Sequence, residues 1–204
     1  MLAAADTARD FVPLVNLARM LVTGANPAAH DRRLGRELER GAHDFVLDVG
    51  CGQALVLRYA RPRRYVGLDL HRPSLDRARR KRGRPGVELV EADITRTDLG
   101  AWRGADVAIV SNVLHHLTDD EAVALLDRIA TAVQPERILV QDAEPAGALA
   151  PVVRALDGGA HLRGRAQLAA MLRARFAVRE VAEWRNPLRS FTYFLLELRR
   201  PPAA

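Results

Sequence analysis

The sequence predicts an α/β fold built on a doubly wound sheet of seven strands. The sheet is mostly parallel, with one reversed strand near the C-terminus and a helical cap at the N-terminus. From residue 44 onward, short continuous apolar runs alternate with segments of helical periodicity, which is typical of buried parallel strands joined by crossover helices. The last two apolar runs are separated only by a loop of hairpin length, so we expect that pair to be antiparallel.

The composition excludes several classes of protein. The 204 residues are 49% hydrophobic and 27% charged, which is unlike a disordered or fibrous chain. The single cysteine, Cys51, excludes an intramolecular disulfide and a cysteine-rich zinc site. We expect no metal site. Because no apolar run approaches about 20 residues and charges fall near the N-terminus, we expect no membrane partner and a cytoplasmic location.

The net charge of +6 would suit a nucleic-acid partner. The basic residues are 30 arginines and the single Lys81, a bias that resembles the codon usage of a GC-rich genome. The densest basic run, at 77–84, has no aromatic residue nearby for base stacking, since none lies between Tyr65 and Trp102. Nucleic acid is therefore a possible but disfavoured partner.

The chain divides into an N-terminal helical cap or lid at 1–40 and a main domain at 41–204. A broad apolar stripe from Phe11 to Val22 precedes a more polar helix, which starts near Pro27 and stops at Gly41. Such a cap would shape an acceptor pocket and exclude water from it.

Each element of the main domain has its own signal. Apolar runs predict strands at 45–49, 65–69, 87–90, 105–110, 137–141, 176–184 and 190–199, and periodicity predicts helices at 53–60, 73–82, 119–133 and 164–174. The helix at 119–133 has a capping box at its start, formed by Thr118 and Glu121. In a doubly wound sheet, ligands bind at the carboxyl ends of the strands where the winding reverses.

A glycine loop, Gly50-Cys51-Gly52, follows the first strand, where glycines let the backbone turn tightly and approach a ligand. Asp69 ends the second strand 21 residues after Asp48, a spacing typical of a carboxylate that accepts hydrogen bonds from ribose hydroxyls. Asp69 could instead cap the helix that begins near Pro73. A dinucleotide site would need a third glycine at position 55, which is leucine, so nicotinamide binding is disfavoured.

Residues 46–52, Val-Leu-Asp-Val-Gly-Cys-Gly, resemble the first motif of the class I S-adenosylmethionine-dependent methyltransferases, and further motifs follow in the family's order within 44–142. Asp69 resembles the ribose-binding acid of that family. The segment 91–94 resembles the one whose aspartate contacts the adenine amine, and 111–117 the one that lies under the methionine moiety. The sequence departs from the family at Ala54, where a third glycine is usual.

The resemblance implies a Rossmann-like methyltransferase domain with S-adenosyl-L-methionine as cofactor. Leu70 and Ile94 would sandwich the adenine, and Asp93 would accept from its amine, although Asp93 alone could equally be a turn residue. The cofactor-binding residues that it implies are Asp48, Gly50, Cys51, Gly52, Asp69, Leu70, Asp93, Ile94, Ser111 and Asn112.

His115 and His116 lie between the end of the fourth strand and the Thr118 cap, at the expected rim of the site. A histidine titrates near neutrality and can accept a proton from a hydroxyl or amine, so either is a candidate catalytic base. The same pair is also a common packing sequence in the family, and methyl transfer can proceed by placement of the nucleophile alone.

The acceptor side of the site is expected to include His161, Arg163 and, more weakly, Tyr193. The stretch 156–163 resembles one found in small bacterial methyltransferases of secondary metabolism or surface sugars. The predicted function is methyl transfer to an oxygen or nitrogen nucleophile of a small molecule. The alternatives are an RNA or protein methyltransferase and a protein that binds S-adenosylmethionine without methyl transfer.

Overall fold

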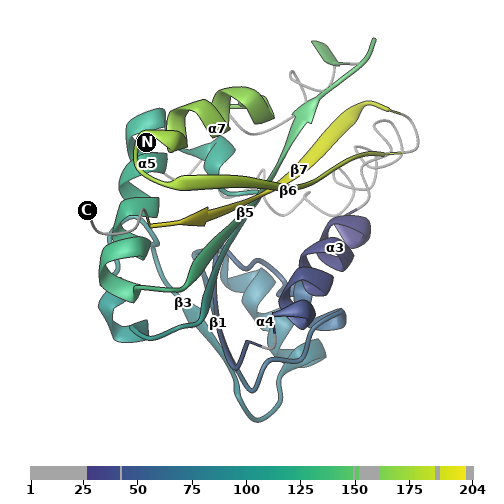
Figure 1. Cartoon of the computed structure of the whole chain (residues 1–204). Helices are drawn as coiled ribbons and strands as arrows, with labels where there is room; N and C mark the ends of the chain where they lie inside the picture. Colours follow the sequence, from purple (N-terminus) through teal and green to yellow (C-terminus); the bar gives the residue numbers. More distant parts are fainter. Residues whose placement is uncertain (1–26, 42, 149, 152–160, 187–188, 201–204) are drawn as a thin grey trace, which may run out of the picture.

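The computed structural model describes residues 27–41, 43–148, 150–151, 161–186 and 189–200 (Figure 1). Most of the predicted cap, at 1–26, and most of the predicted acceptor stretch, at 156–160, therefore lie outside the described residues. Among the described helices, none combines the length and the apolar character that crossing a bilayer requires.

The strands form one seven-stranded sheet in the order β3-β2-β1-β4-β5-β7-β6. Only β7 is reversed, because it pairs antiparallel with both β5 and β6 while the other pairs are parallel. This confirms the predicted architecture, and the winding reverses between β1 and β4. The strands are β1 (Phe45–Val49), β2 (Arg64–Asp69), β3 (Val87–Glu91), β4 (Val107–Ser111), β5 (Arg137–Pro145), β6 (Ala177–Arg185) and β7 (Phe191–Arg199).

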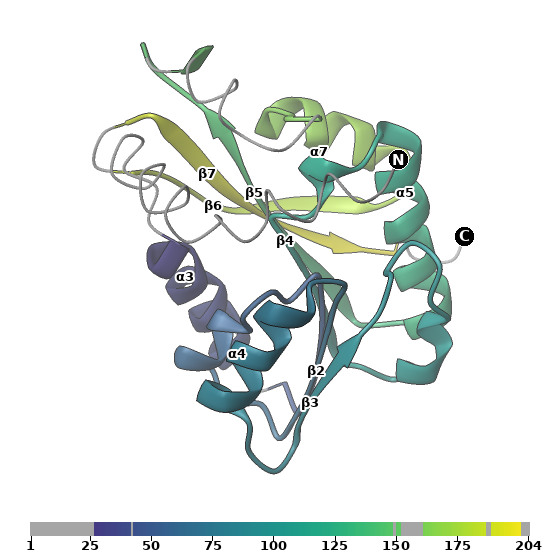
Figure 2. The same cartoon turned by 180° about the vertical axis from the view of Figure 1, so that it is seen from behind.

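Helices cover both faces of the sheet, as Figures 1 and 2 show. α3 (Pro27–Arg40) and α4 (Arg72–Arg82) lie on one face, and α5 (Asp119–Arg128) and α7 (Arg165–Arg173) on the other. The predicted capping box is present, because the Thr118 hydroxyl accepts from the Glu121 amide while the Glu121 carboxylate accepts from the Thr118 amide. After α5 the chain makes a π-helical turn, Ile129–Val133, before β5 begins.

The alternation of side chains along β1 divides the core into two layers. Leu47 and Val49 face α5 and α7, whereas Val46 faces α3 and α4. Leu34 and Leu38 of α3 are buried in that second layer against the sheet. The described part of the predicted cap is therefore packed into the core of the main domain.

The helix predicted at 53–60 is reduced to a single 3-10 turn, η1 (Leu55–Arg58). Gly52 and Ala54 both adopt left-handed backbone conformations, with φ of +51°, so a right-handed helix cannot begin before Leu55. The Ala54 methyl group is fully buried and packs in the core layer of Val46 and Val56. The departure from glycine at this position therefore adds to the core.

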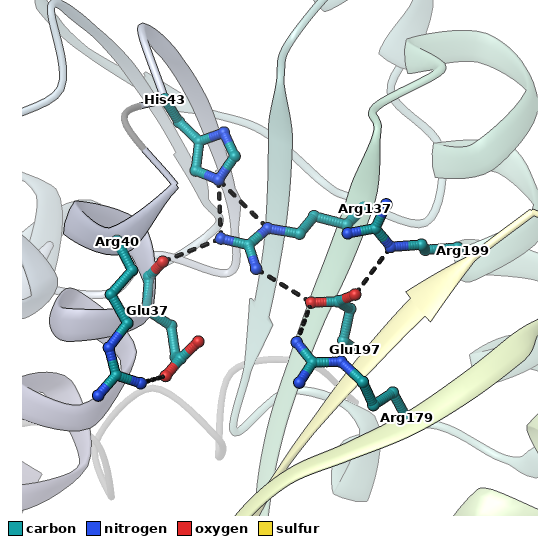
Figure 3. Close-up of polar contacts among 7 residues, drawn as sticks. All are labelled: Glu37, Arg40, His43, Arg137, Arg179, Glu197 and Arg199. Carbon is teal, nitrogen blue, oxygen red and sulfur yellow. Dashed lines mark hydrogen bonds and ion pairs between the residues drawn. The ribbon is translucent and has the colours of Figure 1, made fainter.

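A cluster of charged residues closes the sheet at the amino ends of the parallel strands (Figure 3). The guanidinium of Arg137, the first residue of β5, donates to the Glu37 carbonyl of α3 at 2.9 Å and to a Glu197 carboxylate oxygen of β7 at 3.0 Å. It also contacts the His43 imidazole, whose Nε2 lies 2.7 Å from its Nη2. Arg137 therefore fastens the C-terminal end of α3 to the sheet.

Candidate functional site

A cavity of about 440 Å³ opens at the carboxyl ends of β1, β2, β4 and β5, where the winding of the sheet reverses. Its volume falls in the range of roughly 300–1,000 Å³ that is usual for small-molecule sites. The cavity wall is made by Asp31, Leu34, Asp48, Gly50, Cys51, Gly52, Gln53, Leu55, Val56, Asp69, Ser111, Asn112, His115, His116, Asp142, Ala143, Leu162, Phe191 and Tyr193. Most of the residues expected to bind the cofactor thus share one cavity with both candidate catalytic histidines.

The glycine loop after β1 has a backbone that only glycine adopts easily. Gly50 has φ of +81°, and a Cβ atom there would lie 2.3 Å from Cγ2 of Val113. The amides of Gly50 and Cys51 both donate to the Leu68 carbonyl, which fixes the loop against β2. A Cβ on Gly52 would meet no atom within 4 Å. The loop can therefore bring its backbone close to a ligand at Gly52.

Asp69 joins the end of β2 to this loop. One carboxylate oxygen accepts from the Gly52 amide and the other from the His71 amide, each at 2.7 Å. The residue that caps α4 is His71, so the alternative interpretation of Asp69 as the helix cap is wrong. Asp69 instead holds the loop in place and lines the cavity.

Asp48 is a buried carboxyl group with half of its hydrogen-bonding capacity unused. It is 4% exposed, and its Oδ2 accepts from the Tyr65 hydroxyl at 2.5 Å. Its Oδ1 has no hydrogen-bond partner among the described residues. Burial raises the pKa of Asp48 to about 7, and the nearby Asp31 adds to the effect. Burial also raises the pKa of the Cys51 thiol well above its usual value, so this cysteine is not a nucleophile at neutral pH.

Asp31 was missed by the sequence reasoning, which treated its segment as a lid. It lies on α3 and lines the same cavity as the glycine loop. Burial raises the pKa of Asp31 to about 7, although the charges of Arg82 and Arg58 partly oppose the rise. The position of Asp31 depends on how α3 packs against the sheet. The pattern of charged residues along the helix does not predict that packing.

His115 is paired with a carboxylate of β5, Asp142. Its Nδ1 lies 2.7 Å from Oδ1 of Asp142, and the two side chains are only 12% and 7% exposed. The ring of His116 is 4.2 Å away, centroid to centroid. The register of β4 with β5 pairs Ser111 with Gln141, so adjacent strand ends bring His115 and Asp142 together.

Ser111 and Asn112 form the part of the wall that follows β4. Asn112 has φ of +55°, and its amide donates to the Gln141 carbonyl at 2.8 Å. The Ser111 hydroxyl accepts from the side-chain amides of Gln141 and Asn112. These bonds fix the turn that leads to His115.

The expected adenine contacts lie outside the cavity wall. Leu70 is 63% exposed, and Ile94 packs partly against the core layer beneath α5. Asp93 accepts from the amide and hydroxyl of Thr95, and these bonds lower the pKa of Asp93. The structure thus shows Asp93 in a turn, which was the alternative interpretation of this residue.

The acceptor-side residues divide into two groups. Arg163 is buried away from the cavity, where its guanidinium donates to Asp119 and to the carbonyls of Leu114 and Leu117, which argues against the expected contact with an acceptor. His161 approaches the site only through its amide, which donates to the His115 carbonyl at 3.0 Å; its side chain is not in the wall.

Tyr193 does line the cavity, as expected, and it is joined there by Phe191, which the sequence reasoning did not select. The two rings are stacked with centroids 5.6 Å apart, and Trp184 of β6 stacks on the other side of Tyr193 at 5.8 Å. Within the described ranges, no group of three or more histidine, cysteine, aspartate or glutamate side chains could hold a metal ion.

Comparison with known proteins adds to this geometry. Residues 46–136 match the family model of a methyltransferase domain. The sequence matches none of the curated proteins with which it was compared.

Three solved structures illustrate the structural similarity. The N-methyltransferase NodS from Bradyrhizobium japonicum WM9, in complex with S-adenosyl-L-homocysteine, is 19% identical with a TM-score of 0.65, covering 86% of this chain and 89% of that one. The mitomycin 7-O-methyltransferase MmcR is 25% identical with a TM-score of 0.66, covering 85% of this chain and 54% of that one. Magnesium protoporphyrin IX methyltransferase from Synechocystis PCC 6803, with S-adenosylhomocysteine bound, is 17% identical with a TM-score of 0.58, covering 97% and 100%.

The observations agree on one family. The sheet has the strand order and the single reversed strand that the motifs imply, and the cavity lies at the glycine loop inside the matched residues. The chain thus contains a segment, 46–136, that matches a methyltransferase domain, and it has the fold of the class I S-adenosylmethionine-dependent methyltransferases.

Proposed function

We propose that this methyltransferase transfers the methyl group to an oxygen or nitrogen nucleophile of a small molecule, with His115 as the general base. The observation that carries the proposal is the pair of His115 and Asp142 in the wall of the cavity that also contains the glycine loop and Asp69. A base, its orienting carboxylate and the cofactor loop thus face one space that is large enough for a small ligand.

The residues around the loop are suited to hold the cofactor. Gly52 leaves open space where a side chain would stand, and Asp48 presents a buried oxygen that lacks a donor. Asp69 would accept from the ribose hydroxyls, while Leu70, Asp93 and Ile94 follow β2 and β3 on the side where the adenine would lie. When bound, S-adenosylmethionine supplies an electrophilic methyl group on a positively charged sulfur.

His115 is the stronger of the two histidine candidates because its ring is oriented. An ionised Asp142 accepts from Nδ1–H, so the neutral imidazole carries its lone pair on Nε2. Asp142 is itself held by the Ala143 amide, which donates to the same oxygen at 2.9 Å. His115 would take the proton that the acceptor loses when its oxygen or nitrogen is methylated, and Asp142 would stabilise the resulting imidazolium.

The wall beside His115 suggests the kind of acceptor. Phe191, Tyr193, Ala143 and Leu162 present apolar surface next to the His115–Asp142 pair. Such a wall suits a small molecule with an apolar or ring-shaped body that carries one hydroxyl or amine. A role in bacterial secondary metabolism is part of the same proposal; it rests on the resemblance of 156–163, of which 156–160 lie outside the described residues.

The test is a comparison of His115→Ala with His116→Ala. We expect His115→Ala to lower turnover by roughly 10²–10⁴-fold with little change in cofactor affinity, and His116→Ala to retain most of the activity. Asp142→Asn should also lower turnover and shift the pH profile, because the preferred tautomer of His115 changes. Variants of both histidines that keep at least half of the wild-type rate would overturn the base assignment.

The acceptor class is tested with the wild-type enzyme by measuring S-adenosylhomocysteine release over a panel of small hydroxyl and amine compounds, RNA and protein. We expect turnover with small molecules, and Phe191→Ala should raise KM for the acceptor. Turnover only with RNA, at a rate that falls steeply with salt, would favour the RNA methyltransferase instead.

A further inference from the structure

We propose that Asp31 and Asp48 form a carboxyl pair that binds the α-ammonium group of the cofactor and releases a proton to solvent when it does so. The proposal rests on the proposed cofactor site and adds to it a second acid, supplied by α3. Cofactor binding would thereby be linked both to pH and to the placement of α3.

Asp31 and Asp48 line the same cavity. Asp48 lies near the carboxyl end of β1, and Asp31 lies on α3, the helix that packs over that strand. The charge of Asp31 helps to raise the pKa of Asp48, an effect that requires the two groups to be close. Burial of each group, together with the charge of Asp31 beside Asp48, lets the two carboxyl groups hold a proton near neutral pH.

One oxygen of the pair lacks a hydrogen-bond donor. Oδ2 of Asp48 accepts from the Tyr65 hydroxyl, but Oδ1 has no donor among the described residues although it is buried. A buried acceptor without a donor costs free energy, so a ligand that supplies an N–H there is favoured. Of the two cationic groups of the cofactor, only the ammonium can donate hydrogen bonds, whereas the sulfonium cannot.

The positive charges near the pair lie beside Asp31 and not beside Asp48. Asp31 faces Arg58 of η1, Arg82 of α4 and Tyr65 of β2. These two arginines lower the pKa of Asp31 but do not overcome its burial. Around Asp48 the charged and titratable groups are Tyr65, Asp31, Asp69 and Cys51, none of which is cationic.

The proton balance follows directly. Near pH 7 the free pair holds about one proton between its two carboxyl groups. When the ammonium arrives, its positive charge and its N–H donors favour two carboxylates, and the proton leaves to solvent. The effect requires the amino-acid portion of the ligand, so a nucleoside that lacks it should bind without releasing a proton.

The experiment is isothermal titration calorimetry of the wild-type protein with S-adenosylhomocysteine at pH 7, in phosphate and in Tris, whose ionisation enthalpies differ. We expect release of between about half and one proton per ligand bound. The dissociation constant should fall by roughly tenfold between pH 6 and pH 8. 5′-Methylthioadenosine, which lacks the amino-acid portion, should bind with no buffer-dependent heat.

Asp31→Asn should at least halve the proton release at pH 7 and flatten the pH dependence of the affinity. Asp120→Asn is the matched control, because Asp120 is an exposed helical aspartate outside the cavity. If Asp31→Asn does not fold, the buffer comparison and the 5′-methylthioadenosine comparison on the wild type still decide the question.

The outcomes separate the inference from the proposed function. S-adenosylhomocysteine that binds with the same heat in both buffers, and equally well from pH 6 to pH 8, overturns the carboxyl pair while leaving the cofactor site intact. Equal proton release with 5′-methylthioadenosine overturns the assignment of the ammonium. A wild-type protein that binds no S-adenosylhomocysteine overturns the cofactor site and the pair together.

Discussion

Two buried carboxyl groups lie at opposite ends of the sheet and are treated in opposite ways. Glu197, at the amino ends of the parallel strands, is 2% exposed and accepts from Arg137, Arg179 and Arg199 (Figure 3). Asp48, at the carboxyl ends, is 4% exposed and, within the part of the chain that the structure describes, accepts only from Tyr65. Burial alone would raise both pKa values, but the three arginines hold the pKa of Glu197 to about 2, while that of Asp48 rises to about 7.

Burial alone therefore does not decide the protonation state of a carboxyl group. The hydrogen-bond donors and charges around it decide that state. At the amino end both oxygens of Glu197 accept from arginines, which is what a purely structural cluster requires. At the carboxyl end two buried oxygens, Oδ1 of Asp48 and Oε1 of Gln141, have no donor among the described residues. Such a group is expected where a ligand supplies the missing donor, so the contrast distinguishes a structural cluster from the proposed cofactor site.

The largest effect is expected from Glu197→Gln. The substitution removes the negative charge from Arg137, which is itself buried, and it also weakens the link between β7 and the end of α3. We expect a loss of about 3 kcal/mol in the free energy of unfolding, measured by urea denaturation.

Glu88→Gln is the control, because Glu88 is an exposed strand residue. A Glu197→Gln variant as stable as the control would show that the arginines do not depend on this carboxylate.

Asp69→Ala should weaken cofactor binding by about 1–3 kcal/mol, since a charged acceptor for the ribose is lost from a partly buried site. The substitution also releases the Gly52 amide, so part of the loss comes from the loop. Calorimetry with S-adenosylhomocysteine measures the effect. Unchanged affinity in a folded variant would contradict the assignment of Asp69 as the acceptor for the ribose hydroxyls.

Asp48→Asn tests the raised pKa of Asp48 through the pH dependence of stability. The pKa of Asp48 in the folded protein is raised to about 7, above the value of about 3.9 expected in the unfolded chain. The stability that this group contributes is therefore present below about pH 4 and is lost as the pH rises through about 7. Asparagine does not titrate, so the Tm of the variant minus that of the wild type should increase by about 5 °C between pH 5 and pH 8. A difference that stays constant with pH would contradict the raised pKa.

His43→Gln tests the amino end with a smaller effect. Burial, and then the charge of Arg137, lowers the pKa of His43 below its usual value. Its stabilising contribution is therefore present above about pH 6.5, the value in the unfolded chain, and is lost as the pH falls toward the folded value. Glutamine keeps an acceptor for Arg137 without titrating. Between pH 7.5 and pH 5.5 the free energy of unfolding should fall further in the wild type than in the variant, by less than about 1 kcal/mol. Denaturation curves at the two pH values measure this difference. A larger fall in the variant would contradict the lowered pKa of His43.

The sequence predicted the parts of the molecule that depend on local pattern. Buried parallel strands appear as continuous apolar runs, and the Thr118–Glu121 capping box marks the start of α5 without any tertiary information. The location of the cavity also followed, because the order of strands determines where the winding reverses.

Contacts between distant segments could not be predicted in the same way. The His115–Asp142 pair joins residues 27 apart and depends on the register of β4 with β5. Arg163 was expected beside the acceptor, but the carbonyls of Leu114 and Leu117 and the carboxylate of Asp119 hold its guanidinium in a buried position. η1 replaced a predicted helix because Ala54 adopts a left-handed conformation, which the propensity of alanine opposes.

Helix α3 contacts Arg137 and the cavity at two different angles around its axis. Its Glu37 carbonyl is clamped by Arg137, while Asp31 reaches the cavity six positions earlier, about 9 Å along the axis. Because each residue turns an α-helix by about 100°, one residue inserted between Asp31 and Leu34 would swing the carboxyl group out of the cavity and leave the clamp and the buried leucines in phase. The number of residues between Asp31 and the buried leucines therefore sets the rotation of the helix at Asp31, and with it whether the acid faces the site.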